Sequence, residues 1–269
     1  MDLIQALILG LVEGITEYLP VSSTGHLIIA QQLLGIEEND TSRAYAIVIQ
    51  AGAILAVLGL YRQRVGQMLQ GLRGRDPVGL RLAACVVVAF LPAALLGGLF
   101  DRSIEQRLFG VMPVIAAWIG GAVVILLLSA WTRRHREGKQ LDALAWQGAL
   151  VIGMAQCIAL WPGTSRSLVT ILGGLLVGLS LPAAVEFAFL LGLATLGAAT
   201  AYKSLKLGGG MIEAYGLPSL LAGFAMAWLS AALAVKWMVT WLNRHGLGLF
   251  AWWRLVAAGL AFWLLRSPS

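Results

Sequence analysis

The segment from Leu11 to Ile28 carries several kinds of polar group inside an apolar part of the chain, with the sequence LVEGITEYLPVSSTGHLI. Glu13 and Glu17 are four residues apart, so their carboxylates share one face of a helix. Two carboxylates held together either disfavour each other's ionisation or bind a divalent cation. Three hydroxyls, a glycine and an imidazole follow Pro20, on residues Ser22, Ser23, Thr24, Gly25 and His26.

A second polar interruption, LWPGTSRS, covers residues 160–167. It supplies Ser165, Arg166 and Ser167, and the planar fork of an arginine suits phosphate oxygens. Carboxylates, hydroxyls, a histidine and an arginine around a turn are the groups that metal-assisted phosphoryl chemistry uses. The two segments together therefore indicate a site that handles phosphate.

The elements that must position these groups are those of a membrane protein. Of the 269 residues, 59% are hydrophobic and 12% are charged, about half the charged share of a soluble domain. Apolar runs of about 20 residues match the helix length that crosses a bilayer, and they lack the alternation of barrel strands. Six such spans are predicted, at about residues 43–61, 80–100, 111–131, 183–202, 217–241 and 247–265.

Two further apolar regions, residues 1–36 and about 144–180, are broken midway by the polar segments and their prolines. Hydrocarbon does not tolerate the backbone groups freed by such a break unless protein or water satisfies them. Each region therefore predicts a re-entrant helical hairpin with its tip inside the membrane. The expected fold is an all-α polytopic membrane protein, with six transmembrane helices plus two re-entrant helical hairpins in a single domain over residues 1–269.

The two hairpin regions also resemble each other. Superposing residues 10–25 on residues 153–167 matches Gly10 with Gly153, Glu13 with Gln156 and, after a one-residue gap, Pro20 with Pro162 and Ser23 with Ser165. An odd number of spans separates the hairpins, so the second enters from the opposite face. We therefore expect an inverted-topology repeat, with repeat 1 over about 1–131, repeat 2 over about 140–269, and a site near the bilayer midplane.

Charge predicts the orientation and argues against a nucleic-acid partner. The net charge is +6, but the basic residues cluster at the ends of apolar runs, where topology and anionic headgroups explain them. The basic segments 61–81 and 132–139 are expected in the cytoplasm, whereas residues 36–42 and 101–110 are expected to face outward. Both chain ends then lie outside, and we expect no cleaved secretory signal.

The string EGITEYLPVSSTGH, followed later by PGTSRS, resembles the undecaprenyl pyrophosphate phosphatase family, the BacA/UppP type of bacitracin-resistance protein, over essentially the whole chain. The resemblance implies a multi-pass enzyme of the bacterial inner membrane that hydrolyses undecaprenyl pyrophosphate to undecaprenyl phosphate and inorganic phosphate, for recycling of the cell-wall lipid carrier. It also implies a divalent cation, Mg²⁺ or Ca²⁺, an active site open to the periplasmic side, and a homodimer in the phospholipid bilayer.

By motif position, the resemblance makes Glu13 and Glu17 the metal-binding carboxylates. It makes these residues the phosphate-binding groups: Ser22, Ser23, Thr24, Ser165, Arg166 and Ser167. We expect Arg166 to clamp the pyrophosphate and Ser23 or an activated water to attack. His26 would be the general base or, through a phosphohistidine, the nucleophile. The sequence does not choose between these mechanisms.

Several positions allow other interpretations. The chain has Leu168-Val169 and Ala194 where the family commonly has Gly-Ala and Pro, which affects packing around the second hairpin. Asp142 is expected to cap the helix that enters this hairpin, and Lys236 and Arg254 are expected to snorkel. Glu186 is either a site residue or a buried helix anchor.

The alternative function is a transporter or flippase of undecaprenyl phosphate, because inverted repeats with broken helices also describe secondary transporters.

Overall fold

The computed structural model describes all residues except 38, 109, 135–137, 208–210 and 267–269, and it leaves out the side chains of 40, 101–107, 129–134, 203, 206–207, 211–214 and 266. The part it describes is all helical. The helices, with two short 3₁₀ segments, are α1 (Leu3–Thr16), α2 (Ser23–Leu33), α3 (Asp40–Leu60), α4 (Arg62–Leu72), α5 (Pro77–Leu108), α6 (Val111–Arg134), η1 (Leu141–Ala143), α7 (Trp146–Gln156), η2 (Cys157–Leu160), α8 (Arg166–Leu176), α9 (Leu181–Leu207), α10 (Met211–His245) and α11 (Gly248–Arg266).

Six helices in the described part of the chain are long and apolar enough to cross a membrane, which confirms the six predicted spans. They run over Thr41–Leu60, Pro77–Phe100, Val111–Leu128, Leu181–Tyr202, Tyr215–His245 and Gly248–Leu265. The span of α9 continues without a break past Ala194, where the family's proline would remove a backbone donor. The helices α1, α2, α7 and α8 are each 14 residues or shorter and are too short to cross about 30 Å of hydrocarbon.

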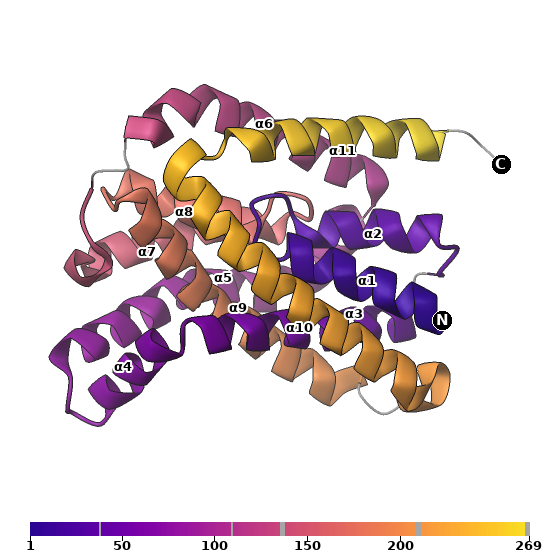
Figure 1. Ribbon diagram of the computed structural model, residues 1–269, viewed down its shortest axis with the longest axis horizontal. Coiled ribbons are helices and arrows are strands. Elements are labelled where there is room, and N and C mark those ends of the chain that lie inside the picture. Colours follow the sequence, from indigo (N-terminus) through magenta and orange to yellow (C-terminus); the bar gives the residue numbers. More distant parts are fainter. Residues whose placement is uncertain (38, 109, 135–137, 208–210, 267–269) are drawn as a thin grey trace.

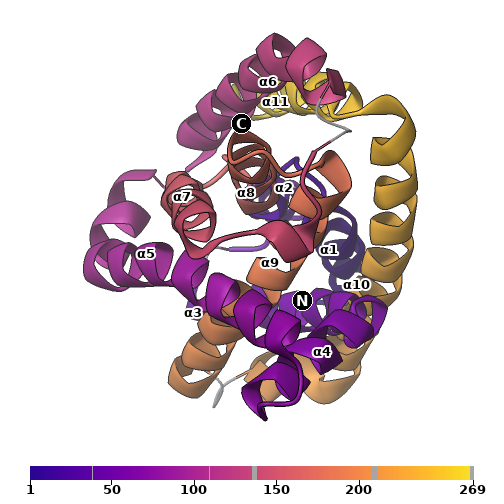
Figure 2. The same ribbon diagram turned by 90° about the vertical axis from the view of Figure 1, so that its left-hand side faces the viewer.

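The short helices lie inside a ring of long ones. In Figure 2, α8 and α2 occupy the centre, with α10 along one side, α5 on the other and α6 with α11 above them. Figure 1 shows α6 and α11 running side by side, and it shows α1 beginning and α11 ending at the same end of the molecule, opposite α4. The ring therefore encloses the polar turns that follow α1 and precede α8.

Small residues allow the short helices to approach the ring closely. A Cβ atom on Gly10 would collide with the backbone carbonyl of Gly223 in α10, and one on Gly153 would collide with the carbonyl of Ala89 in α5. Interfaces built on small residues are typical of packed membrane helices. In this way α1 of the first half packs on α10 of the second, and α7 of the second half packs on α5 of the first.

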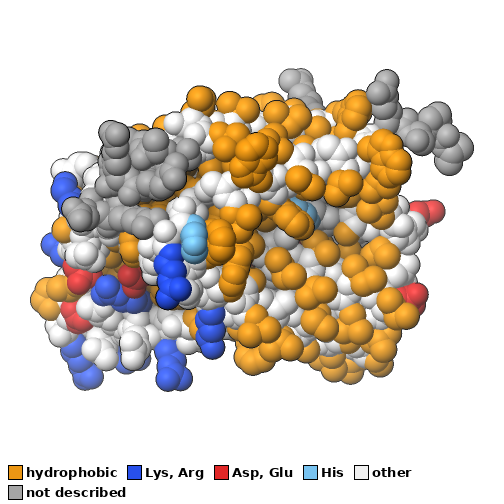
Figure 3. Space-filling model, turned by 45° about the horizontal axis from the view of Figure 1, so that its top comes forward, with side chains coloured by type: hydrophobic (Ala, Val, Ile, Leu, Met, Phe, Trp, Pro, Cys, Tyr) orange, Lys and Arg blue, Asp and Glu red, His pale blue; other side chains and the backbone are white. Residues whose placement is uncertain are grey.

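Charged side chains gather at the end that carries α4, while much of the remaining surface in view is hydrophobic (Figure 3). There Arg64 pairs with Glu186 at 2.7 Å and with Asp142 at 3.0 Å. Glu186 is therefore an ion-paired helix anchor, one of the two alternatives considered for it. The prediction that Asp142 caps α7 is wrong, because Asp142 lies in η1 and the N-cap position belongs to Ala145.

Candidate active site

One serine in each polar turn, just before α2 and just before α8, has an unusual backbone conformation. Ser22 is the N-cap of α2 with φ 73° and ψ 100°, and Ser165 is the N-cap of α8 with φ 78° and ψ 108°. They are the non-glycine residues with positive φ in the described chain. Such values cost about 1–3 kcal/mol per residue and tend to occur at functional sites. The two turns therefore share one local geometry.

This geometry corrects the predicted register between the two segments. Ser22, not Ser23, corresponds to Ser165. Ser22 and Ser165 are 143 positions apart, as are Gly10 and Gly153 and also Glu13 and Gln156, so no gap is needed. The predicted match of Pro20 with Pro162 is not kept, because Pro20 lies two residues before Ser22 and Pro162 lies three residues before Ser165. In the corrected register, Ser23 corresponds to Arg166.

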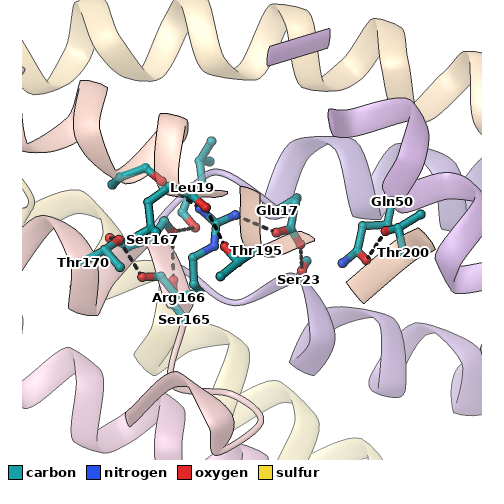
Figure 4. A network of polar contacts seen from close by, with 12 residues as sticks. Glu17, Leu19, Ser23, Gln50, Ser165, Arg166, Ser167, Thr170, Thr195 and Thr200 are labelled. Atoms are coloured by element: carbon teal, nitrogen blue, oxygen red, sulfur yellow. Dashed lines mark hydrogen bonds and ion pairs between the residues drawn. The ribbon is translucent and has the colours of Figure 1, made fainter. Parts of the chain in front are cut away.

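A hydrogen-bonded chain joins the two turns at their centre (Figure 4). The hydroxyl of Ser23 donates to Oε2 of Glu17 through a short contact. The other carboxylate oxygen, Oε1, accepts from Nη2 of Arg166 at 3.0 Å. Both charged side chains are almost enclosed, with 6% of Glu17 and 12% of Arg166 exposed. The structure thus brings together Ser23, Glu17 and Arg166, as the sequence predicted.

Arg166 is fixed by its surroundings. Its Nη1 donates to the carbonyl of Ala188 at 3.0 Å, and its guanidinium lies 5.3 Å from the ring centroid of Tyr18, within the range of a cation–π contact. A Cβ atom at Gly192 would collide with Nη1, so only glycine leaves room for the guanidinium there. The buried Nε has no hydrogen-bond partner within the described residues.

The hydroxyls of the second turn have two different environments. Ser165 lines the central cavity together with Ser22, Ser23 and Thr24. Ser167 donates to the carbonyl of Leu19 at 3.0 Å and lies 3.0 Å from the Ser165 hydroxyl. Ser167 therefore ties the second turn to the first and is not among the residues that line the cavity. Leu168 and Val169 are buried behind it.

The cavity has a volume of about 510 Å³. The polar groups of both turns form one wall, and helices α5 and α9 supply apolar residues that include Phe90, Ala94, Leu196 and Tyr202. Ligand sites commonly combine such an apolar surface with a few convergent polar groups. The cavity can accordingly hold a phosphate group beside Arg166 and an apolar chain next to it.

Glu13 lies one helical turn before Glu17 on α1 and is 1% exposed. Both of its carboxylate oxygens lack a hydrogen-bond partner among the described residues. Two unpartnered buried oxygens next to a second carboxylate fit a divalent cation, whose preferred ligands are oxygens. No group of three or more His, Cys, Asp or Glu side chains gathers in the described part of the chain, so any ligands beyond these two carboxylates would be other oxygens, from the protein, water or substrate.

His26 does not join this cluster. Its Nδ1 lies 2.7 Å from the carbonyl of Ser22, and its Nε2 accepts from the indole of Trp253 at 3.0 Å. The ring also packs against Trp118, with centroids 4.6 Å apart. Both ring nitrogens are therefore engaged, and His26 is absent from the residues that line the cavity. The predicted contact between His26 as base and Ser23 is replaced by the contact between Glu17 and Ser23.

The sequence interpretation missed Arg254. It was expected to snorkel, yet it is 0% exposed. Its five N–H groups donate to five backbone carbonyls, those of Ala117, Trp118, Pro20, Gly163 and Thr164, at 2.8–3.2 Å. Because the last three belong to the two turns, Arg254 holds both in place. One feature of the sequence could have indicated this role. Arg254 lies inside an apolar run, away from its ends, where its side chain cannot easily reach the membrane surface.

Comparisons with known proteins agree with the motifs. Residues 6–260 match the family model described as bacitracin resistance protein BacA. The chain is 45% identical over 263 residues to an undecaprenyl-diphosphatase of Sorangium cellulosum, covering 97% of this chain and 85% of that protein. It is 46% identical over 261 residues to undecaprenyl-diphosphatase 2 of Rhodospirillum rubrum, covering 96% and 93%. An undecaprenyl-diphosphatase of Cupriavidus necator is 42% identical over 272 residues, covering 94% and 92%.

Proposed function

The chain belongs to the bacitracin resistance protein BacA family, and we propose that it hydrolyses undecaprenyl diphosphate at the junction of its two polar turns. It is an undecaprenyl-diphosphatase and a multi-pass membrane protein of a bacterial family. Its products are undecaprenyl phosphate and inorganic phosphate, so it returns the lipid carrier for cell-wall synthesis. The observation that carries the proposed location is the chain of contacts from Ser23 through Glu17 to Arg166.

In the proposed mechanism, Glu17 is the base and Ser23 is the nucleophile. Glu17 accepts the Ser23 proton as Oγ attacks the terminal phosphorus, the bond from that phosphorus to the bridging oxygen breaks, and undecaprenyl phosphate leaves. Water then hydrolyses the phosphoserine. Arg166 stabilises the charge on the phosphoryl oxygens, because its Nη2 contacts Glu17 beside the Ser23 hydroxyl.

His26 has a supporting role in this proposal. Its hydrogen bond to the Ser22 carbonyl and its packing between Trp118 and Trp253 hold the residue that precedes the nucleophile. Ser22 has a strained backbone, and such conformations persist only where the surroundings hold them. His26 thus positions Ser23 and transfers no proton.

Glu13 and Glu17 would hold a divalent cation, Mg²⁺ or Ca²⁺. The unpartnered oxygens of Glu13 support this assignment. When bound, such an ion supplies positive charge that offsets the charge of a diphosphate.

We further propose that the short helices form two re-entrant hairpins, α1–α2 and α7–α8, in an inverted repeat. Three features support the proposal: the constant separation of 143 residues, the shared conformation of Ser22 and Ser165, and the exchanged packing of Gly10 and Gly153 on the opposite halves. Broken elements that meet near the midplane are typical of inverted repeats.

The cavity is proposed to open to the periplasm. It is lined by Gly97, Gly98 and Tyr202, near the ends of the α5 and α9 spans that lie away from basic α4. Two of the segments from which the orientation was predicted, 101–107 and 132–139, lie largely outside the described side chains.

A cysteine introduced at exposed Glu37 should react with an impermeant thiol reagent outside spheroplasts, while one at Arg73 should not. The reverse pattern would contradict the orientation.

The homodimer expected from family resemblance also remains a proposal. Size-exclusion chromatography with light scattering of the detergent-solubilised protein should give twice the 28.6 kDa chain mass after the detergent is subtracted. A mass of one chain would contradict it.

Release of phosphate tests the function directly. Purified protein in detergent should liberate inorganic phosphate from undecaprenyl diphosphate, and Arg166→Ala should not. A flippase would move labelled undecaprenyl phosphate across vesicle membranes without releasing phosphate. Lipid movement without hydrolysis would contradict the proposed reaction.

A further inference from the structure

A buried amide lies in the wall of the cavity and has no role in the mechanism above. Gln156 is the last residue of α7, is 2% exposed, and lines the cavity with Ser23 and Arg166. Its Nε2 has no hydrogen-bond partner within the described residues. An unsatisfied buried amide costs about 1–3 kcal/mol, so each such group in a folded protein needs an explanation.

The neighbouring threonine does not satisfy this amide. Thr195 lies 3.5 Å from Oε1 of Gln156, at the limit of a hydrogen bond. The same hydroxyl is 2.7 Å from the carbonyl of Leu191, which takes its single proton. The amide of Gln156 therefore retains unused hydrogen-bonding capacity beside a cavity built for a charged ligand.

The alignment of the two turn regions at a separation of 143 positions indicates which kind of ligand group this amide would bind. Gln156 corresponds to Glu13, and Arg166 corresponds to Ser23. The first turn region thus presents oxygens, on Glu13 and Glu17, whereas the second presents N–H donors, on Gln156 and Arg166. Oxygens attract a cation, and N–H donors attract phosphate oxygens.

We propose that Gln156 is a further substrate-binding residue, whose amide N–H donates a hydrogen bond to a phosphate oxygen of the diphosphate. The inference rests on the proposed function, because it assigns a residue to the same site. Arg166 contacts the diphosphate as a cation, and Gln156 adds a neutral donor from the neighbouring helix. Its role is in affinity and orientation, not in proton transfer.

Two substitutions of Gln156 test this role, one that removes the donor and one that replaces it with a negative charge. Gln156→Leu removes the donor with similar volume, and Gln156→Glu keeps the shape but presents a carboxylate to the phosphate. A hydrogen bond to a charged group is worth about 1.5–3 kcal/mol, which corresponds to about 10-fold or more in affinity. We expect the KM for undecaprenyl diphosphate to rise about 10-fold in Gln156→Leu and further in Gln156→Glu, with kcat within about threefold of wild type.

The matched control is Gln147, an exposed glutamine on the same helix. Gln147→Leu and Gln147→Glu should leave KM unchanged. Calorimetric binding of inorganic pyrophosphate provides a readout that does not need turnover, and it should weaken by the same factor in the Gln156 variants only. Failure of wild type to release phosphate would contradict the proposed function, whereas unchanged pyrophosphate affinity in both Gln156 variants would overturn the role of Gln156. A fall in kcat and thermal stability at constant KM and affinity would also overturn it.

Discussion

The hydroxyl of Ser23 donates its hydrogen bond to Glu17, not to the histidine three residues later in the same motif. Glu17 is in turn bonded to Arg166 at 3.0 Å, so the proposed nucleophile, its proposed base and the proposed phosphate-binding cation form one continuous chain. His26 has both ring nitrogens occupied elsewhere. This relationship is the reason for proposing that a carboxylate removes the serine proton.

The first prediction separates the two candidate bases. Glu17→Gln should lower kcat by about 10²–10⁴-fold, the usual contribution of a general base, because an amide does not accept the serine proton. His26→Phe, which keeps an aromatic ring between Trp118 and Trp253, should retain much more activity, and its pH profile should follow that of wild type. Severe loss in His26→Phe that recovers as the pH rises would instead identify His26 as the base.

A second prediction concerns the geometry of Arg166. Arg166→Lys keeps the charge, but one ammonium group does not reproduce the separate contacts to Glu17 and Ala188. Activity should fall about 10- to 100-fold, as expected for loss of charged hydrogen bonds of about 1.5–3 kcal/mol. Arg62→Lys, on the exposed part of α4, is the control and should be unaffected. Near-normal turnover of Arg166→Lys would contradict the clamp.

The third prediction concerns the cation. A chelator should abolish phosphate release, and Mg²⁺ or Ca²⁺ should restore it. Glu13→Gln should raise the cation concentration needed for half-maximal activity by at least about tenfold, because an amide is a poorer ligand for a hard cation. Glu37→Gln, at an exposed position, should behave as wild type. Full activity in chelator would refute a role for the metal.

A fourth prediction tests the residue that joins the turns. Arg254→Gln has too few donors for five carbonyls, and each buried carbonyl left unpaired costs about 1–3 kcal/mol. The melting temperature in detergent should fall by at least about 5 °C, and activity should fall with it because both turns lose their anchor. The exposed control Arg73→Gln should leave both unchanged. A stable and active Arg254→Gln enzyme would show that other contacts hold the turns.

The sequence predicted the membrane spans because their lengths and apolar content follow from the bilayer itself. It predicted the grouping of Glu17, Ser23 and Arg166 because polar groups inside apolar runs need partners. It did not predict Arg254, since its carbonyl partners are brought together only by tertiary packing, as far as 234 residues away in the case of Pro20.

The predicted contact between His26 and Ser23 is not formed for a similar reason. The closeness of His26 to Ser23 in the motif suggested proton transfer, but the partner that occupies its Nε2 is Trp253, 227 residues later. The predicted register of the two turns aligns Pro20 with Pro162, whereas the backbone angles of Ser22 and Ser165 define the correspondence. Neither the contact of His26 with Trp253 nor these backbone angles can be read from the spacing of residues within a motif.

Trapping the covalent intermediate tests directly whether Ser23 is the nucleophile. Wild-type enzyme is mixed with undecaprenyl diphosphate labelled in its terminal phosphate. The reaction is quenched within milliseconds, in acid for one sample and in base for a parallel sample, and the labelled residue is mapped by mass spectrometry. We predict an acid-stable phosphate on Ser23, absent from Ser23→Ala and reduced in Glu17→Gln. A phosphate that is lost in acid but survives in base, located on His26, would contradict the assignment of Ser23 as the nucleophile.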